Sequence, residues 1–531
     1  MLVNQRIKIL EIGLMYDLVI KNGKIIDGSG GEPYFADVAV KDGKIVRIGS
    51  ISDGAKRTID ASGLTVTPGF IDSHSHADYA VFTLSAMKEK VEQGITTAIA
   101  GQCGDSVAPL SASYDKNDPA VYGDYGRVYD IRKTMDSFLE HGAGVPLGCN
   151  IATFVGHGAL RESIMGMENR APTEEELERM KDALRRALRG GAYGMSTGLY
   201  YTPGSYATED EIIALAKVVG EEGGVISSHI RTESNAVLDA AEEFINVVKA
   251  SGARGVHSHI KSCGENNFGK VKTLLEMIDK ANAEGSDIYC DVYPYNASNT
   301  SLSSSFVPKE LHADGKILEN LRDPEKRQIA RDFIDKIFGR SDLSWALVVS
   351  AENRPDCIGK RMPEIAKERG TDPYDTVFDI ILDSKRRATA CYFRMSEADV
   401  ETAIKYPRAM ICTDSGVAKS NSYHPRLRAS FPRAISRYSL RNPLVALPEM
   451  VRKITSLPAH VYGLCGKGLI KEGYDADICI FSEEKFIDRS DFVNPTLGCE
   501  GLNYVLVSGE IAAENAVATG KLAGRLLRKN H

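Results

Sequence analysis

The chain has 531 residues, 43% of them hydrophobic, and a formal net charge of −7 at pH 7. This length and apolar content allow a large buried core, and they suggest either several domains or one barrel with additions. The small net charge and the lack of any run of five or six like charges give no support to a role on nucleic acid or on a membrane surface, so we expect a small-molecule partner.

The sequence also indicates where the protein is located and which cysteine-based structures it lacks. No apolar stretch approaches the roughly 18 residues of a membrane span. Residues 1–18 lack the apolar core and cleavage site of a signal peptide, so we expect a cytoplasmic protein. The ten cysteines occur singly and without a CxxC pair, which argues against a disulfide framework or a zinc knuckle.

The two ends of the chain share one pattern. Residues 16–66 contain short strand-like runs with turns at KNGK, KDGK and ASG, and residues 466–510 repeat that style. We therefore predict a small composite β-domain, formed by residues 1–65 together with residues 466–531.

Between these ends, short apolar runs alternate with helical patterns, which is typical of a parallel sheet with crossover helices. One of the helices has clear end signals: Thr173 begins a capping box with Glu176, and Gly190 and Gly191 end the helix. Eight runs fit a (β/α)₈ barrel over residues 66–465. They are 66–76, 94–103, 148–157, 191–201, 223–230, 254–262, 287–295 and 409–416.

The segment 296–408 is too long for one connection of a barrel. It predicts the seventh crossover plus an insertion late in the barrel, with a lid around residues 296–345. Within it, NASNTSLSSSFVP is expected to be a loop that could close over the barrel mouth.

The first run ends in PGFIDSHSHAD, which carries His74 and His76. Residues i and i+2 of a strand point the same way, so both imidazoles can reach one metal ion. Alone, such a pair is a weak signal, because chance and structural pairs are common.

The ends of the other runs strengthen the case for a metal site, because barrel enzymes place their reactive groups at the carboxyl ends of strands. Any one of these residues could be a buried thiol or a core histidine, but together they predict a metal site. The predicted ligands are His74, His76, Cys103, His229, His259 and Asp414. His257 shares the face of His259 deeper in the barrel and is expected to have a structural or supporting role. His157 also ends a strand and could hydrogen-bond near the site, but it is not expected to touch the substrate.

These motifs resemble the amidohydrolase superfamily, and within it the D-aminoacylase (N-acyl-D-amino-acid deacylase) family. The resemblance covers nearly the whole chain and includes PGFIDSHSHAD, GQCG, STGLYYTPGSYA, SSHIRTE, SHIKSCGE, YPY, CTDSG and HPR. Gln102 departs from the asparagine expected before the cysteine, which could alter metal retention or rate.

The fourth run has no lysine, whereas most cyclic-amidase relatives carry a carboxylated lysine there that bridges two metals. Cys103 is a natural substitute, because a thiolate binds zinc strongly. The resemblance implies that Cys103, His229 and His259 hold a tight zinc ion. It implies a weaker second position at His74, His76 and Asp414.

The resemblance implies a zinc-dependent hydrolase that releases a carboxylate and a free D-amino acid from N-acyl-D-amino acids. Zinc makes hydroxide available at neutral pH, and Asp414 is the expected general base and acid. In the family a tyrosine, this lysine and this arginine bind the substrate carboxylate. The expected substrate-binding residues are Tyr201, in preference to Tyr200, with Lys261, Arg426 and, with less weight, Ser298.

Two alternatives stay open. One is a cyclic amidase resembling hydantoinase or dihydroorotase, and the other is an inactive barrel that serves as an assembly module. The sequence leaves open the number of metals, the acyl group, the oligomeric state and the preferred side chain. Residues contacting that side chain are expected within 296–345, and an acidic preference would require an additional arginine.

Overall fold

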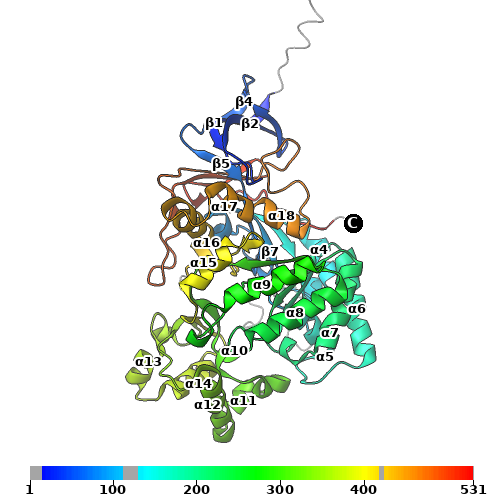
Figure 1. Cartoon of the computed structure of the whole chain (residues 1–531), viewed down its shortest axis with the longest axis vertical. Coiled ribbons are helices and arrows are strands. Elements are labelled where there is room, and N and C mark those ends of the chain that lie inside the picture. Colours follow the sequence, from blue (N-terminus) through cyan, green and yellow to red (C-terminus); the bar gives the residue numbers. More distant parts are fainter. Residues whose placement is uncertain (1–14, 112–129, 418–423, 530–531) are drawn as a thin grey trace, which may run out of the picture.

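The computed structural model describes residues 15–111, 130–417 and 424–529, and its centre is a barrel of parallel strands (Figure 1). Each of the eight predicted runs contains one barrel strand. The barrel strands are β6 (Phe70–Asp72), β7 (Ile95–Ala100), β8 (Asn150–Thr153) with β9 (Val155–Gly156), β10 (Gly194–Gly198), β11 (Val225–His229), β12 (Arg254–His257), β13 (Ile288–Val292) and β17 (Ala409–Ile411).

The strands follow one another around the barrel in chain order. One parallel sheet has the order β6-β7-β8, and the other has the order β9-β10-β11-β12-β13-β17. Only Phe154 separates β8 from β9, so these two form an interrupted third strand. The circle closes between the last strand and the first, where Ser75 and Ser415 form a parallel bridge. The predicted (β/α)₈ fold is confirmed.

Helices surround the barrel, as Figure 1 shows for α6 to α9. The predicted capping box is present at the start of α6, where Thr173 and Glu176 bond each other's backbone. The helices of the barrel are α2 (Lys88–Val91), α4 (Met135–Gly142), α5 (His157–Met165), α6 (Glu174–Arg189), α7 (Glu209–Glu221), α8 (Val237–Ser251), α9 (Lys270–Ala283), α15 (Glu397–Lys405), α16 (Arg426–Ile435), α17 (Leu447–Ile454) and α18 (Ser456–Tyr462). Within the described residues, none of the helices combines the length and the apolar character needed to cross a bilayer.

The first predicted run is divided into two strands at Gly69. β5 (Thr65–Pro68) belongs to the terminal β-sheet, and β6 belongs to the barrel. A Cβ at Gly69 would lie 2.2 Å from the hydroxyl oxygen of Thr96, so the close approach of the chain to β7 requires glycine here. The division couples the two sheets directly, because β5, inside the terminal sheet, leads straight into β6 of the barrel.

Strands from both ends of the chain form one nine-stranded sheet. β18 (Ile478–Phe481) pairs with β5 on one side and with β21 (Leu502–Val507) on the other, which joins the two halves. Its core contains Ile20, Val38, Ile478 and Leu506, all buried. The remaining strands of the sheet are β1 (Tyr16–Ile25), β2 (Tyr34–Lys41), β3 (Lys44–Gly49), β4 (Ala55–Asp60), β18 (Ile478–Phe481), β21 (Leu502–Val507), β22 (Glu510–Glu514) and β23 (Val517–Ala518). β19 (Ile487–Asp488) and β20 (Cys499–Glu500) pair separately.

The segment between β13 and β17 contains a small α/β unit with a hydrophobic cluster of its own. Figure 1 places its helices at the end of the molecule opposite β1 to β4. NASNTSLSSSFVP is not a loop as predicted, since it contains β14 (Ser298–Ser301) and α10 (Leu302–Phe306). The unit extends past residue 345 through α11 (Ile317–Asn320), α12 (Pro324–Phe338), β15 (Ala346–Ala351), α13 (Met362–Arg369), α14 (Pro373–Asp383) and β16 (Ala388–Tyr392).

A segment near the C-terminal end completes the barrel wall. The backbone N–H of Ile151 in β8 donates to Arg525, and the N–H of Leu527 donates to Ile151, at 3.0 and 2.7 Å. The N–H of Lys529 donates to Gly191, just before β10. Residues 524–529 therefore lie along the seam where the third strand is interrupted.

Candidate metal centre

The six predicted ligand residues all lie at the carboxyl ends of barrel strands. His74 and His76 follow β6, Cys103 follows β7, and His229 is the last residue of β11. His259 follows β12, and Asp414 follows β17. Their ligand atoms form two groups, within each of which they lie no more than 4.8 Å apart. The groups are His74, His76, Cys103 and Asp414, and Cys103, His229 and His259, so the cysteine belongs to both.

The thiol of Cys103 is the centre of the cluster. Its sulfur lies 3.2 Å from Nε2 of His74, 3.3 Å from Nε2 of His259 and 3.7 Å from Nδ1 of His229. Tetrahedral zinc, with bonds of about 2.3 Å to sulfur and about 2.0 Å to nitrogen, holds such ligands about 3.5 Å apart. The spacing and the soft donor set therefore fit zinc.

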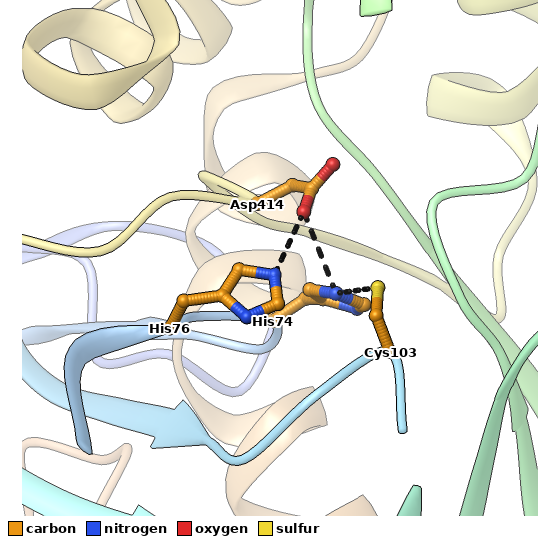
Figure 2. A group of neighbouring side chains, drawn as sticks. All are labelled: His74, His76, Cys103 and Asp414. Atoms are coloured by element: carbon orange, nitrogen blue, oxygen red, sulfur yellow. Dashed lines mark hydrogen bonds and ion pairs between the residues drawn. The ribbon is translucent and has the colours of Figure 1, made fainter. Parts of the chain in front are cut away.

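Asp414 faces the first pair of histidines, as Figure 2 shows. Its Oδ1 lies 3.3 Å from Nε2 of His76 and 3.6 Å from Nε2 of His74. Its Oδ2 accepts a hydrogen bond of 2.7 Å from Arg426. Burial raises the pKa of Asp414, but Arg426, followed by His259, outweighs burial and holds it well below its usual range. The carboxylate is therefore ionised at neutral pH.

Backbone strain marks three of the ligand positions. The φ angles are +56° at Cys103, +35° at His259 and +45° at Asp414. Side-chain-bearing residues rarely occupy this region, and such residues cluster at functional sites. Hydrogen bonds hold two of them in place, because the N–H of His259 donates to Asp291 at 2.6 Å and the N–H of Asp414 donates to the carbonyl of His74 at 2.9 Å.

The two later histidines are suited to metal binding by their charge state. Burial lowers the pKa of His229 to about 4, and burial with Lys261 and His229 lowers the pKa of His259 well below its usual range. Both imidazoles are therefore neutral at pH 7, which is the form that ligates a metal.

Two carboxylates that the sequence interpretation missed support the histidines. Oδ2 of Asp291, in β13, lies 3.5 Å from Nδ1 of His74, and both residues are fully buried. Oε1 of Glu233 lies 3.2 Å from Nδ1 of His259 and 2.5 Å from Nζ of Lys261. Asp291 could have been noticed as an acid inside an apolar strand. Glu233 had only its place in the SSHIRTE motif.

Lys261 and Arg426, both predicted to bind substrate, flank one aromatic ring. Nζ of Lys261 lies 5.5 Å from the ring centre of Tyr293, and Cζ of Arg426 lies 4.8 Å from it. Nε of Arg426 is buried and has no hydrogen-bond partner within the described part of the chain, so its hydrogen-bonding capacity is unused there. Tyr293 is a further residue that the sequence interpretation missed, although its YPY motif was recognised.

The predicted tyrosines and Ser298 line the same cavity, whose volume is about 1040 Å³. The Tyr201 ring lies 4.9 Å from the His229 ring, and its hydroxyl lies 3.1 Å from that of Thr300. Tyr200 lies 5.5 Å from His229, ring to ring. The inserted unit thus forms part of the wall, beside the six candidate metal ligands, which we call the metal-ligand cluster.

Three residues of the sequence analysis lie away from the cavity wall. Nε2 of His157 lies 2.9 Å from Glu211, and both are buried. His257 is buried at the end of β12, with its ring 5.9 Å from that of Phe244. Oε1 of Gln102 accepts a 2.6 Å hydrogen bond from Ser227. These contacts describe packed, internal side chains.

Comparisons with known proteins agree with this arrangement. A model described as amidohydrolase family matches residues 57–297 and 359–513. The chain is 34% identical to a D-aminoacylase of Alcaligenes xylosoxydans xylosoxydans, over 97% of this chain and 98% of that protein.

Two solved structures are similar over the same extent, each covering 97% of this chain and 100% of the other chain. One is an N-acyl-D-glutamate deacylase of Bordetella bronchiseptica complexed with zinc and a phosphonate inhibitor, with 30% identity and a TM-score of 0.82. The other is a structure of D-aminoacylase that addresses the role of its binuclear metal centre, with 32% identity and a TM-score of 0.82.

Proposed function

Because this chain belongs to the amidohydrolase family and matches D-aminoacylases over nearly its whole length, we propose that it hydrolyses the amide bond of N-acyl-D-amino acids. The products are a carboxylate and a free D-amino acid. One observation on this chain supports the proposal most directly. Cys103, which belongs to both groups of candidate ligands, lies in the wall of the same cavity as Lys261, Tyr293 and Arg426. A metal centre beside paired cations suits an amide substrate that also carries a carboxylate.

Cys103, His229 and His259 would hold the tighter zinc ion, because they combine a thiolate with two neutral imidazoles. His74, His76 and Asp414 would hold a second, weaker ion, with Cys103 between the two positions. A bound zinc ion supplies Lewis acidity, which polarises a carbonyl and makes water a stronger acid.

The protein's own residues would supply the proton transfers. Asp414 is ionised and buried beside His76, so it can accept a proton from the attacking water and deliver it to the leaving amine. Arg426 holds one carboxylate oxygen, which fixes the direction of the other. Asp291 and Glu233 would orient the imidazoles of His74 and His259.

Lys261 and Arg426 would bind the α-carboxylate of the substrate, with Tyr293 between them. Arg426 suits this task because its Nε has no partner in the part of the chain that the structure describes, and because guanidinium binds carboxylate through two hydrogen bonds. Tyr201 and Tyr200 would pack beside the substrate near His229, and Ser298 would contribute a polar group from the inserted unit.

A cyclic-amidase function receives less support. The segment of β10, Gly194–Gly198, is fully buried and contains no lysine that could be carboxylated to bridge two metals. Conversion of hydantoins or dihydroorotate in place of N-acyl-D-amino acids would revive that alternative.

The test is release of free amino acid from a panel of N-acetyl-D- and N-acetyl-L-amino acids, with metal content measured on the same preparation. We expect turnover of D-compounds that is abolished in Asp414→Asn. Protein that contains zinc but turns over no member of the panel would overturn the deacylase assignment.

A further inference from the structure

Arg394, which the sequence interpretation did not single out, lies in the wall of the cavity just beyond the inserted strand β16. Its carbonyl accepts a 2.8 Å hydrogen bond from the N–H of Gly264, in the loop that follows Lys261. A Cβ at Gly264 would lie 2.8 Å from Nη2 of Arg394. The guanidinium is therefore seated directly against the loop that leads from the metal-ligand cluster.

Two aromatic rings of the inserted unit hold this guanidinium. Its Cζ lies 4.5 Å from the ring centre of Phe338 and 5.0 Å from that of Trp345. Cation–π contacts fix the position of the group through its face, and they leave the N–H edge available for hydrogen bonding. Arg394 is thus held against these rings in the wall of the cavity.

Arg394 differs from the other cations in the wall that are at least half-buried, because it has no acidic partner in the described residues; Lys309 and Lys336 also line the cavity, but both are exposed. Arg231 pairs with Glu243 at 2.6 Å, and Lys261 pairs with Glu233 at 2.5 Å. No carboxylate lies within ion-pair distance of Arg394 in residues 15–111, 130–417 and 424–529. Burial lowers the pKa of Arg394, with only Cys263 and Tyr200 opposing it, so the cost of burying its charge is not offset by an ion pair.

We infer that Arg394 binds a carboxylate in the substrate side chain, so that the preferred substrates are N-acyl derivatives of acidic D-amino acids. This inference rests on the proposed function, in which Lys261 and Arg426 take the α-carboxylate. An acidic substrate then needs a second cation in the same cavity, and Arg394 is that cation. Tyr200 and Arg394 line the same cavity, and the Tyr200 ring is 5.5 Å from that of His229.

The first experiment compares kcat/KM for matched substrates that differ only in charge. For wild type we expect N-acetyl-D-glutamate and N-acetyl-D-aspartate to exceed N-acetyl-D-glutamine and N-acetyl-D-asparagine by about 10- to 100-fold, as one charge-assisted bidentate contact allows. Arg394→Met should remove that preference while leaving kcat/KM for N-acetyl-D-methionine within a few-fold of wild type.

A matched control is available in the same inserted unit. Cζ of Arg361 lies 4.5 Å from the Phe393 ring, but Arg361 is not among the residues that line the cavity. Arg361→Met therefore removes an arginine that packs on an aromatic ring without removing a cation from the site. We expect it to retain the acidic preference.

A second readout does not depend on turnover. Trp345, the single tryptophan of the chain, contacts Arg394, so a ligand at this arginine should change its fluorescence. Titration with free D-glutamate, a product that is not hydrolysed, should change the emission in wild type and in Arg361→Met but not in Arg394→Met. D-Methionine should produce no comparable change.

The outcomes separate the inference from the function on which it rests. If wild type turns over N-acetyl-D-methionine as well as N-acetyl-D-glutamate and Arg394→Met leaves the ratio unchanged, the acidic preference is wrong and the deacylase function stands. A wild type that instead prefers N-succinyl-D-methionine to N-acetyl-D-methionine, and that loses this preference in Arg394→Met, would show that Arg394 binds a carboxylate of the acyl group. That result also overturns the inference. If no N-acyl-D-amino acid is hydrolysed, the proposed function fails first.

Discussion

The guanidinium of Arg426 donates a 2.7 Å hydrogen bond to Oδ2 of Asp414, so a residue expected to bind substrate is ion-paired with the residue expected to transfer the proton. Both groups are buried. Arg426 lines the cavity; its Nη2 donates a 3.3 Å hydrogen bond to the Asn299 carbonyl, and its Nε has no partner in the described residues. One side chain can therefore link substrate binding to the position of the proton acceptor.

Replacing this arginine should impair both steps. A lysine ammonium has no planar fork and cannot hold Asp414 and a substrate carboxylate in the same way. For Arg426→Lys we expect KM to rise and kcat to fall, with kcat/KM reduced about 10- to 100-fold, because a hydrogen bond to a charged group contributes about 1.5–3 kcal/mol.

Arg428 is the matched control for steady-state kinetics on the same D-substrates. It lies two residues further along α16 and pairs with Glu89 and Glu92, each at 3.1 Å. Arg428→Lys should leave KM unchanged. An unchanged KM in Arg426→Lys itself would remove Arg426 from the carboxylate site.

The central position of Cys103 predicts how metal is lost from ligand variants. Cys103→Ser should purify with little or no zinc, because the thiol belongs to both ligand groups. His76→Asn should retain about one ion, because His76 belongs only to the group that contains Asp414. Metal analysis by mass spectrometry decides the matter, and equal zinc content in the two variants would contradict this division.

The contact between Asp291 and His74 predicts an effect on metal affinity from a residue that does not touch the metal. Removing the carboxylate beneath a ligating imidazole typically costs 10- to 100-fold in affinity. We expect this loss in Asp291→Asn, measured by competition with a zinc chelator.

Asp399→Asn provides the comparison, because Asp399 is also a buried carboxylate but serves to accept hydrogen bonds from the N–H of Gly269, at 2.9 and 3.0 Å. If both variants lose the same zinc affinity, the effect of Asp291 is a general consequence of burial rather than of its contact with His74.

The barrel, and the clustering of the six candidate ligands at its carboxyl end, were predictable from sequence because parallel barrel strands are buried on both faces and form continuous apolar runs. Each predicted ligand follows from where such a run ends. The supporting groups were not predictable in this way. Asp291 meets His74 from more than 200 residues away, and Glu233 and Arg394 act through partners that the tertiary fold provides.

The inserted unit was misjudged for a similar reason. Ser298–Ser301 is polar and lacks the alternation of a half-buried strand, so its sequence predicts a loop. In the structure it pairs with β16, about 90 residues later, and its polar side chains line the cavity. Its composition suits a binding surface rather than a hydrophobic core.

A pH-dependent prediction concerns Lys453, which is fully buried in α17. Its ammonium donates to the carbonyls of Tyr406 and Ala409. Burial lowers the pKa of Lys453 to about 8, from about 10.4 in an unfolded chain, so the folded state binds fewer protons between these values. The free energy of unfolding therefore rises with pH across that window. Below pH 8 the buried charge of Lys453 lowers it by its full amount, on the order of 3 kcal/mol.

Lys453→Met removes this pH dependence together with the two hydrogen bonds. The Tm of the variant, relative to wild type, should be higher at pH 7.5 than at pH 9.5, as measured by calorimetry. Lys405→Met, at an exposed lysine, should give a difference that does not vary with pH. The same constancy in Lys453→Met would mean that burial does not disfavour the charge of Lys453.

The pairing of residues 524–527 with β8 has a consequence for the order of events during synthesis. These residues leave the ribosome after every barrel strand has been made, and β18 and β21, which complete the terminal sheet, emerge only shortly before them. β9 can already pair with β10, but β8 lacks its backbone partners from residues 524–527 on the nascent chain, so this part of the barrel wall is completed late in folding. A nascent chain arrested before residue 524 should be far more sensitive to protease at β8 than the released protein.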